Sequence, residues 1–533
     1  MNLHGLSLIL GQTTRPGGRT FHAVDARIGG ALAEVFHEAS SDDARAAGDA
    51  AASACADYAA LPAERRALFL ERIATEIEAL GDSLLDRCQA ETGLPLARLQ
   101  GERARTCGQL RLFAGLVREG SWVDARIDPA LPERTPLPRP DLRRMLVPLG
   151  PVVVFGSSNF PFAFSVAGGD TASALAAGCP VIVKAHRSHP GTSERVATAV
   201  LRAVAACEVP AGVFSLLHGG GATIGVELVK HPATAAVGFT GSHAAGRALC
   251  DAAAARPCPI PVFAEMSSLN PLVILPGALR SRPVAIAQGL CASFTLGVGQ
   301  FCTKPGLVFT LAGAGLEEFT RQLGESVRAC SAAPMLSPSI RTEFLKHRAE
   351  VSGVPGVRLL ASAPAPERPT DGEPSVVTTT AETFLINPRL ATEVFGPFTV
   401  VVVAQSFADL RRCLETLDGQ LTATLQADPA DNASARALLP LLTRRAGRVV
   451  MNGFPTGVEV CPAMQHGGPH PATSDARFTS VGTAAILRFA RPVCFQNLAP
   501  ELLPPELQDQ NPRGLMRLID GTPTREPLQG PRR

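Results

Sequence analysis

The stretch Leu146-Val147-Pro148-Leu149-Gly150-Pro151-Val152-Val153-Val154-Phe155, followed by the turn Gly156-Ser157-Ser158-Asn159, decides the fold. Its apolar side chains predict a strand over residues 146–155 that is buried on both faces. The sequence over 166–177 then predicts a helix. A buried strand that leads through a glycine turn into a helix is typical of a parallel α/β sheet.

The same alternation continues toward the C-terminus. Further strands are predicted at 180–184, 213–217 and 235–240, with helices at 192–207 and 226–230. A second block past Glu265 predicts strands at 271–275, 307–311, 398–404 and 447–452, and a helix at 284–296. The pattern predicts a doubly wound α/β architecture, and a chain of 533 residues should form two or three domains.

The N-terminal part differs from these blocks. The alanine-rich stretch 41–88 and the stretch 96–117 predict helices, and Pro62 marks a helix start within the first. Residues 129–140 contain five prolines, which favours a linker or an extended arm over a helix or a central strand. Residues 364–374 predict a proline-rich surface loop.

Composition excludes several classes of partner. A net charge of +2 gives no reason to expect nucleic acid or an anionic membrane. Residues 1–16 do not resemble a signal peptide, and no apolar run reaches the roughly 20 residues that span a bilayer. The 13 cysteines follow no disulfide framework, which predicts free thiols and a cytoplasmic protein.

One cysteine lies in an unusual setting, the stretch Gly299-Gln300-Phe301-Cys302-Thr303-Lys304-Pro305-Gly306. A structural cysteine normally lies within an apolar run, where it packs as a small hydrophobe. Cys302 instead lies in a turn of small and polar residues, where its thiol could reach a substrate. Most of the other cysteines must be structural, so the turn alone only suggests a nucleophile.

Two polar residues could serve such a nucleophile. Glu265 is a lone acid among apolar and small residues, and burial there would raise its pKa and suit it to act as a general base. Asn159 follows the first strand, and its neutral amide could stabilise an oxyanion. An ordinary capping glutamate and an Asx turn before Pro161 are the structural alternatives.

Dinucleotide binding is suggested by the turn Phe239-Thr240-Gly241-Ser242-His243-Ala244-Ala245-Gly246. Glycines between a strand and a helix let the backbone approach a pyrophosphate, although the spacing is not G-x-G-x-x-G. Lys184 ends the second strand, where it could bind ribose or phosphate, and Arg187 follows it. Because 184–187 offers bases and no acid, it favours NADP. A glycine turn with a helix cap and a surface lysine explain these features equally well.

A metal site is the remaining alternative. Cys461, His466 and His470 are spaced loosely like metal ligands, but glycine and proline separate them and no second cluster completes a site. We therefore expect a loop and no metal. His186 and His189 are likewise expected to be loop histidines.

Taken together, these residues resemble the aldehyde dehydrogenase superfamily over nearly the whole chain. The landmarks occur in the order of the family: Asn159-Phe160-Pro161, Lys184, Phe239-Thr240-Gly241-Ser242, Glu265, Gly299-Gln300-Phe301-Cys302 and Glu393-Val394-Phe395-Gly396-Pro397. Other segments resemble the branch that contains 2,5-dioxovalerate (α-ketoglutarate semialdehyde) dehydrogenases and NADP-dependent fatty aldehyde dehydrogenases: 162–171, 189–194, 466–469 and 477–483, with 491–497 closest to the dioxovalerate enzymes.

The resemblance implies a role for each matching residue. Cys302 would attack the aldehyde, Asn159 and the backbone N–H of Cys302 would hold the oxyanion, and Glu265 would activate the water that hydrolyses the thioester. Cofactor contacts would come from Lys184, Arg187, Gly241, Ser242, Gly246, Glu393 and Phe395, with NADP expected and NAD possible. Ser158 departs from the family, where tryptophan commonly precedes the asparagine, and Arg187 stands where NAD-preferring members commonly carry a glutamate.

The resemblance also implies an arrangement of domains. We expect a Rossmann-like NAD(P)-binding domain (1–126 and 142–266), an α/β catalytic domain (267–462) and a small β oligomerisation arm (127–141 and 483–500, with a strand near 483–489). The tail, 501–533, is given no role. A homodimer or a homotetramer is implied, and a dimer is our expectation.

The implied activity is NADP-dependent oxidation of 2,5-dioxopentanoate to 2-oxoglutarate. A fatty aldehyde dehydrogenase with an apolar tunnel is the first alternative, because a dicarboxylate semialdehyde needs cations at the pocket mouth. Arg105 and Arg111 are candidates for these cations. A scaffold that kept only the fold would not need Cys302, Glu265 and Asn159, and a CoA-acylating relative would lack Glu265.

Overall fold

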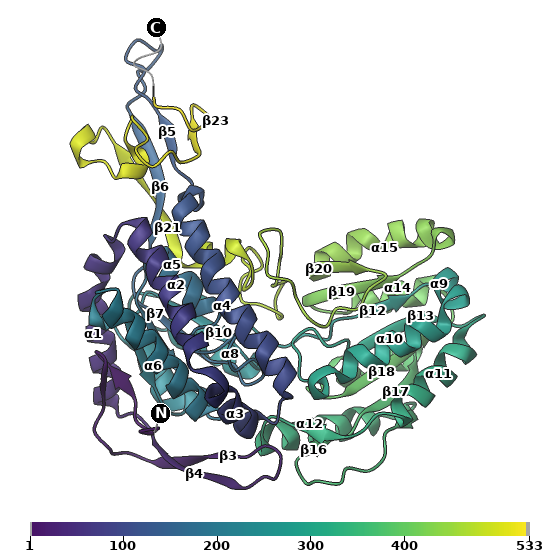
Figure 1. Cartoon of the computed structure of the whole chain (residues 1–533). Coiled ribbons are helices and arrows are strands. Elements are labelled where there is room, and N and C mark those ends of the chain that lie inside the picture. The colour runs from purple at the N-terminus through teal and green to yellow at the C-terminus, as the bar shows by residue number, and fades with distance from the viewer. Residues whose placement is uncertain (1–2, 529–533) are drawn as a thin grey trace.

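The chain folds into two α/β lobes that lie side by side, with an arm that projects from the first lobe (Figure 1). This computed structural model describes residues 3–528, so the first two residues of the 1–16 segment and the last five of the tail lie outside it. Among the described residues no helix is long and apolar enough to cross a membrane. All 13 cysteines lie within them, and all are free thiols.

A seven-stranded sheet forms the centre of the first lobe, in the order β11-β10-β7-β8-β9-β1-β2. The first five strands are parallel, whereas β1 and β2 are antiparallel additions at one edge. Val152 and Val154 pack into one hydrophobic core and Val153 and Phe155 into the other, so both faces are buried as predicted. The bounds are β1 Leu8–Ile9, β2 Gln12–Thr13, β7 Val152–Phe155, β8 Val181–Lys184, β9 Phe214–Leu217, β10 Ala236–Thr240 and β11 Val262–Glu265.

Helices cover this sheet, and a hairpin of β3 (Thr20–Val24) and β4 (Ala31–His37) extends below it (Figure 1). The predicted helical stretch 41–88 forms three helices, and Pro62 caps the second of them as predicted. The bounds are α1 Ser41–Ala59, α2 Ala63–Ala79, α3 Gly81–Thr92, α4 Leu96–Glu119, α5 Gly169–Ala177, α6 Pro190–Ala206, α7 Val226–Lys230 and α8 His243–Ala254.

The second lobe repeats the plan with a seven-stranded sheet in the order β15-β17-β18-β13-β12-β19-β20. All its neighbouring strands are parallel except β15 and β17. The strands are β12 Leu272–Ile274, β13 Leu307–Leu311, β15 Arg358–Ser362, β17 Ser375–Thr380, β18 Phe398–Ala404, β19 Gln420–Gln426 and β20 Ala446–Met451. The helices are α9 Pro276–Ser281, α10 Pro283–Thr295, α11 Leu316–Arg328, α12 Pro338–Ser352, α13 Ala381–Ile386, α14 Phe407–Glu415 and α15 Asn432–Arg445. A minor pair consists of β14 (Ala333–Pro334) and β16 (Asp371–Gly372).

The arm is a five-stranded sheet in the order β21-β6-β5-β22-β23. Its longest pairing is antiparallel, between β6 (Leu142–Pro148) and β21 (Ala490–Gln496). The proline-rich stretch 129–140 connects β5 (Arg126–Asp128) to β6, as an extended arm would. The tail adds β22 (Arg517–Ile519) and β23 (Thr522–Thr524) to the same sheet.

Three predictions about individual elements were wrong. Residues 146–155 belong to two strands in different sheets, because Pro148, Gly150 at φ 127° and Pro151 interrupt the run. The helix expected over 166–177 begins only at Gly169. The strand expected at 483–489 is a 3₁₀ helix, and the strand β21 begins directly after it.

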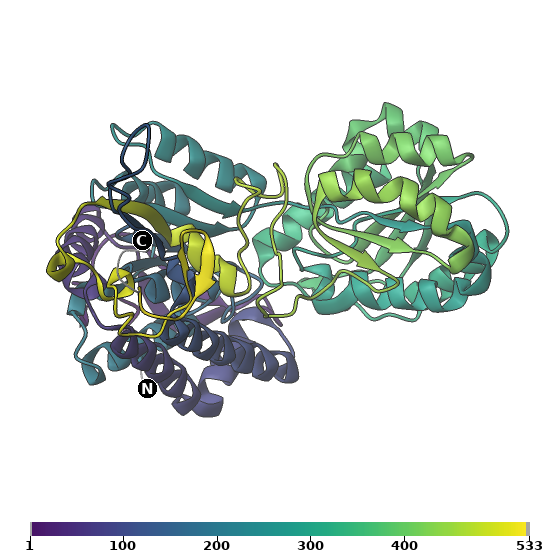
Figure 2. The same cartoon turned by 90° about the horizontal axis from the view of Figure 1, so that it is seen from above.

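Seen from above, the segment between β20 and β21 runs back from the second lobe to the first (Figure 2). It is anchored at the end of β11, where Glu265 forms an isolated antiparallel bridge with Thr473. The N–H of Met266 also donates to the carbonyl of Ala472 at 2.7 Å. This connection brings the end of β11, the turn before β13 and the segment after β20 together at the junction of the lobes.

Candidate active site

Cys302 lies in a tight turn between α10 and β13, at the junction of the lobes. Gly299 has a φ of 64°, and a Cβ atom there would lie 2.3 Å from the backbone of Gly396. Only glycine allows this contact, so the cysteine turn rests directly on the segment 393–397. Cys302 keeps some exposure, unlike the buried Cys88 or Cys179.

The buried amide of Asn270 holds this turn from beneath. Its Nδ2 donates to the carbonyls of Cys302 at 2.8 Å and Lys304 at 3.0 Å. Its Oδ1 accepts from Ser268 at 3.0 Å and from Thr422 at 2.9 Å. Asn270 was not predicted from the sequence, because nothing local shows that an asparagine before a strand supports a distant loop.

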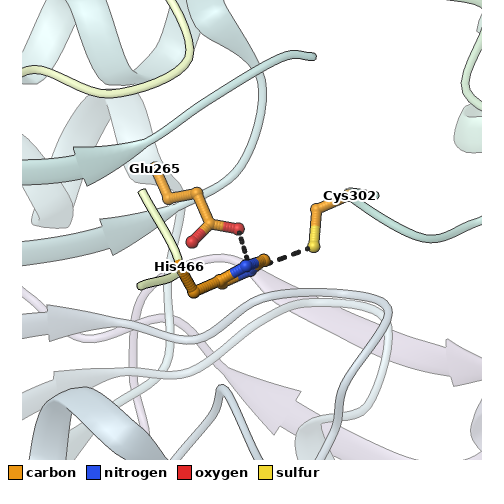
Figure 3. Close-up of side chains that lie close together, drawn as sticks. All are labelled: Glu265, Cys302 and His466. Carbon is orange, nitrogen blue, oxygen red and sulfur yellow. Dashed lines mark hydrogen bonds and ion pairs between the residues drawn. The ribbon is translucent and has the colours of Figure 1, made fainter. Parts of the chain in front are cut away.

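Three side chains from different segments meet beside the turn (Figure 3). The Sγ atom of Cys302 lies 3.4 Å from Nε2 of His466. Oε1 of Glu265, at the end of β11, lies 3.0 Å from the same nitrogen. The reactive atoms of the three residues all lie within 4.8 Å of one another. The structure thus brings the predicted Cys302 and Glu265 together and adds a histidine between them.

Thr479 and Ser480 position this trio. The N–H of His466 donates to Oγ1 of Thr479 at 2.8 Å, and the N–H of Ser480 donates to the carbonyl of His466 at 2.8 Å. The hydroxyl of Ser480 donates to Oε2 of Glu265 at 2.6 Å. These contacts fix His466 and Glu265 relative to each other.

The expectation that burial would leave Glu265 with a raised pKa was wrong. Burial does act in that direction, but the charge of His466 and hydrogen bonds with His466 and Ser480 outweigh it, so the pKa of Glu265 lies below its ordinary value. The carboxylate is therefore ionised at neutral pH. Burial and the negative charge of Glu265 hold the pKa of the Cys302 thiol well above its ordinary value. The thiol consequently needs a base, and Nε2 of His466 lies 3.4 Å from its sulfur.

Asn159 is buried and contacts the cysteine turn through Gln300. Its Nδ2 donates to the backbone carbonyl of Gln300 at 3.0 Å, and the backbone carbonyl of Asn159 accepts from Nη2 of Arg98 at 2.9 Å. An amide nitrogen carries two N–H groups, so one donor is left over beyond the contact with Gln300.

The predicted cofactor residues of the first lobe gather at the carboxyl edge of its sheet. Lys184 ends β8, and Gly241 and Ser242 join β10 to α8, two strands away. Ser242 caps α8, and the N–H of Gly241 donates to the carbonyl of Glu265 at 3.0 Å. A Cβ atom on Gly246 would lie 2.7 Å from Sδ of Met266, so glycine permits close packing of the helix on the strand end.

The end of β8 carries two cations and one acid. Arg187 stacks on Phe21, with its guanidinium carbon 4.7 Å from the ring centroid, and its Nη2 lies 3.2 Å from Oε1 of Glu38. Burial, together with repulsion from Arg187, lowers the pKa of Lys184 to about 8. The segment 184–187 itself contains no acid, but Glu38 reaches Arg187 from a remote segment, directly after the β3–β4 hairpin.

Glu393 and Phe395 belong to the loop that packs on the cysteine turn. Burial raises the pKa of Glu393, although the nearby ammonium of Lys304 and hydrogen bonds with Ser267 and Ser268 oppose the shift. The buried Nζ of Lys304 donates to the carbonyls of Val394 and Phe398, both at 2.9 Å. Lys304 therefore ties this loop to the cysteine turn.

The remaining candidates lie in different places. Arg111 is half-exposed and pairs with Glu78 at 2.7 and 2.6 Å, so the proposal that it serves the pocket was wrong. Arg105 lies over the rings of Phe160 and Phe164, and its charge acts on the Cys302 thiol. Among the described residues, the cluster able to hold a metal is Glu265, Cys302 and His466, and it excludes Cys461 and His470.

Comparison with known proteins identifies the family of the chain. The model of the family described as "Aldehyde dehydrogenase family" matches residues 14–475. Alpha-ketoglutaric semialdehyde dehydrogenase 2 of Azospirillum brasilense is 53% identical over 98% of this chain and 99% of its own length. Alpha-ketoglutaric semialdehyde dehydrogenase of Acinetobacter baylyi is 47% identical, with the same coverage.

A solved structure shares the fold. PnpE in complex with nicotinamide adenine dinucleotide superposes on this chain with a TM-score of 0.79 at 22% identity. The match covers 93% of this chain and 98% of PnpE. The predicted α/β fold is confirmed by this likeness. The predicted resemblance is confirmed as well, since the family model spans most of the sequence: the chain belongs to the aldehyde dehydrogenase family.

Proposed function

We propose that this protein oxidises 2,5-dioxopentanoate to 2-oxoglutarate with NADP, through a thioester on Cys302. The observation that carries the proposal is the position of the Cys302 thiol, 3.4 Å from His466 and within 4.8 Å of the Glu265 carboxylate. The substrate is taken from the two relatives at 53% and 47% identity, whose names specify alpha-ketoglutaric semialdehyde.

The reaction begins with the thiol. His466 accepts the proton of Cys302, and the resulting imidazolium is stabilised by the ionised carboxylate of Glu265 at 3.0 Å. The thiolate attacks the aldehyde carbon, and the oxyanion is held by the free N–H of Asn159 and the backbone N–H of Cys302. Collapse of the hemithioacetal releases a hydride and leaves a thioester.

Hydrolysis of the thioester falls to Glu265. Its carboxylate is ionised and lies within 4.8 Å of Sγ, so a water beside it can reach the acyl carbon while Glu265 accepts the proton. Ser480 keeps the other carboxylate oxygen in place at 2.6 Å. Release of the acid restores the free thiol.

The residues at the carboxyl edge of the first sheet fit a nicotinamide dinucleotide. The N-terminus of α8 suits a pyrophosphate, with Gly241 and Ser242 at its start, and Lys184 suits the adenosine ribose. Glu393 and Phe395 would contact the nicotinamide ribose and ring. When bound, this cofactor accepts the hydride. The solved complex of PnpE with nicotinamide adenine dinucleotide supports a cofactor on this fold.

NADP is proposed over NAD on the charges at the end of β8. Lys184 and Arg187 supply two positive charges against the single acid Glu38, which leaves a net positive site for a 2′-phosphate. We also propose the division into an NAD(P)-binding domain, a catalytic domain and an arm, and a dimer whose interface is the arm. Free thiols at all 13 cysteines support a cytoplasmic location.

An aldehyde panel assayed with both NAD and NADP tests the function. We expect the highest kcat/KM with 2,5-dioxopentanoate and NADP, and no NADPH formation by Cys302→Ala. A strong preference for decanal would show that the protein is instead a fatty aldehyde dehydrogenase. Full activity in Cys302→Ala would remove the thioester mechanism.

A further inference from the structure

One face of α4 is turned toward the cysteine turn and carries three charged residues. Arg98, Glu102 and Arg105 lie four and three positions apart, a spacing that places them on the same side of a helix. Glu102 is buried and the two arginines are half-buried. A buried charge is costly unless it has a partner, so the partners of each of the three side chains matter.

Arg98 and Glu102 are engaged in holding neighbouring loops. The guanidinium of Arg98 lies 4.7 Å and 4.5 Å from the ring centroids of Phe160 and Phe301, and its Nη2 donates to the carbonyl of Asn159 at 2.9 Å. Oε1 of Glu102 accepts from the N–H groups of residues 162 and 163 at 2.9 and 3.0 Å. Its Oε2 lies 3.6 Å from Nη2 of Arg98.

Arg105 is the exception on this face. Its guanidinium lies 5.7 Å from the ring centroid of Phe160 and 5.5 Å from that of Phe164. Its buried Nε and Nη2 have no hydrogen-bond partner among residues 3–528. Its positive charge opposes the upward shift of the Cys302 thiol pKa, so it acts electrostatically on the reacting atom. A buried donor pair without a partner is costly unless a ligand supplies one.

A further cation approaches from the second lobe. Arg448, on β20, donates to the carbonyls of Gly457 at 3.0 Å and of Pro455, and its buried Nε has no partner in the described part of the chain. It also acts electrostatically on Cys302. Arg98, Arg105 and Arg448 therefore bring positive charge to the surroundings of the thiol, which also contain the acids Glu102, Glu265 and Glu393.

We propose that Arg105 holds the carboxylate of the substrate and thereby selects short ω-oxo carboxylates over uncharged aldehydes. The inference rests on the proposed function and adds the residue that carries its specificity. The planar fork of a guanidinium matches a carboxylate with two parallel hydrogen bonds. The rings of Phe160 and Phe164 lie beside that fork, where they can pack on the methylene groups between carboxylate and aldehyde.

The test compares two aldehydes of equal length, 2,5-dioxopentanoate and pentanal, in wild type and in Arg105→Gln. We expect the ratio of their kcat/KM values to fall by about 10- to 100-fold in the variant, as the loss of charge-assisted hydrogen bonds requires. Arg105→Lys should recover part of the ratio, because it restores the charge without the fork. Arg111→Gln on the same helix is the matched control and should leave both substrates unaffected.

Binding gives a second readout that does not depend on turnover. Glutarate, titrated calorimetrically into Cys302→Ala, should bind, and the additional change Arg105→Gln should abolish that binding. An unchanged ratio of the two kcat/KM values, which equal losses for both aldehydes would give, would overturn the role of Arg105. Glutarate binding that survives in the double variant would overturn it as well.

The outcomes also separate this inference from the proposed function. A wild type that prefers 2,5-dioxopentanoate, with an unchanged ratio in Arg105→Gln, would keep the function and overturn the inference. A wild type that binds glutarate through Arg105 but prefers a different ω-oxo carboxylate would keep the inference and overturn the proposed substrate.

Discussion

Replacement of His466 by glutamine tests the arrangement in Figure 3 most sharply. The Cys302 thiol has a pKa well above its ordinary value because burial and the charge of Glu265 disfavour the thiolate. In the wild type, transfer of its proton creates an imidazolium whose nitrogen lies 3.4 Å from the thiolate sulfur. Glutamine cannot accept that proton, so the variant must form a thiolate that faces the Glu265 carboxylate without a cation between them.

The magnitude follows from the distance. Two unit charges 3.4 Å apart attract by about 5 kcal/mol at an effective dielectric constant of about 20. That energy corresponds to roughly three to four pKa units at the thiol. Because glutamine can still donate one hydrogen bond to sulfur, we expect a net upward shift of about two units and a fall in kcat/KM of about 100- to 1,000-fold.

The assay is the rate of iodoacetamide alkylation of Cys302 as a function of pH, in wild type and in His466→Gln. The inflection should move to higher pH in the variant. His470→Gln is the matched control, since His470 belongs to the same loop but lies against His243, with the ring centroids 5.9 Å apart. An alkylation profile that is the same in wild type and His466→Gln would refute the reasoning.

Three further predictions concern the cofactor edge and the support of the cysteine turn. Lys184 has a pKa of about 8 and binds an anion only when protonated, so NADP affinity measured by fluorescence titration should weaken as pH rises through that value, and this dependence should vanish in Lys184→Met. Glu38→Gln frees Arg187 from its ion pair and should raise the preference for NADP over NAD by about fivefold in steady-state kinetics; an unchanged ratio would count against Arg187 as the 2′-phosphate contact. Asn270→Ala leaves the carbonyls of Cys302 and Lys304 unpaired, so the free energy of unfolding in urea should fall by about 2–4 kcal/mol; no change would show that the amide does not support the turn.

Strands such as β7, β8, β12 and β13 could be predicted because their apolar runs are buried and glycine or proline marks their ends. The strands β11, β15, β17 and β19 were not predicted. The run 146–155 was predicted as one strand because it is apolar over nearly its whole length. Apolar composition cannot show that Pro148 and Pro151 divide it between the arm sheet and the first sheet. Likewise, the tail pairs with β5 through contacts that depend on tertiary structure alone.

The residues of the site could likewise be predicted only where a local motif marks them. Cys302, Glu265 and Asn159 could be named because each lies in a short local motif. His466, Asn270 and Glu38 act through partners that are distant in sequence, and no local pattern reports such contacts. The pKa of Glu265 was misjudged for this reason, since burial is visible in an apolar neighbourhood but the hydrogen bonds that outweigh it come from residues 466 and 480.

The central claim is that Cys302 carries the substrate as a thioester that Glu265 helps to hydrolyse. Mass spectrometry of intact Glu265→Gln, mixed with 2,5-dioxopentanoate and NADP, tests it directly. The account predicts one equivalent of NADPH and one acyl group, located on Cys302 by peptide mapping and missing from Cys302→Ala/Glu265→Gln. NADPH formation without an acyl group on the protein, or an acyl group on a different residue, would contradict the account.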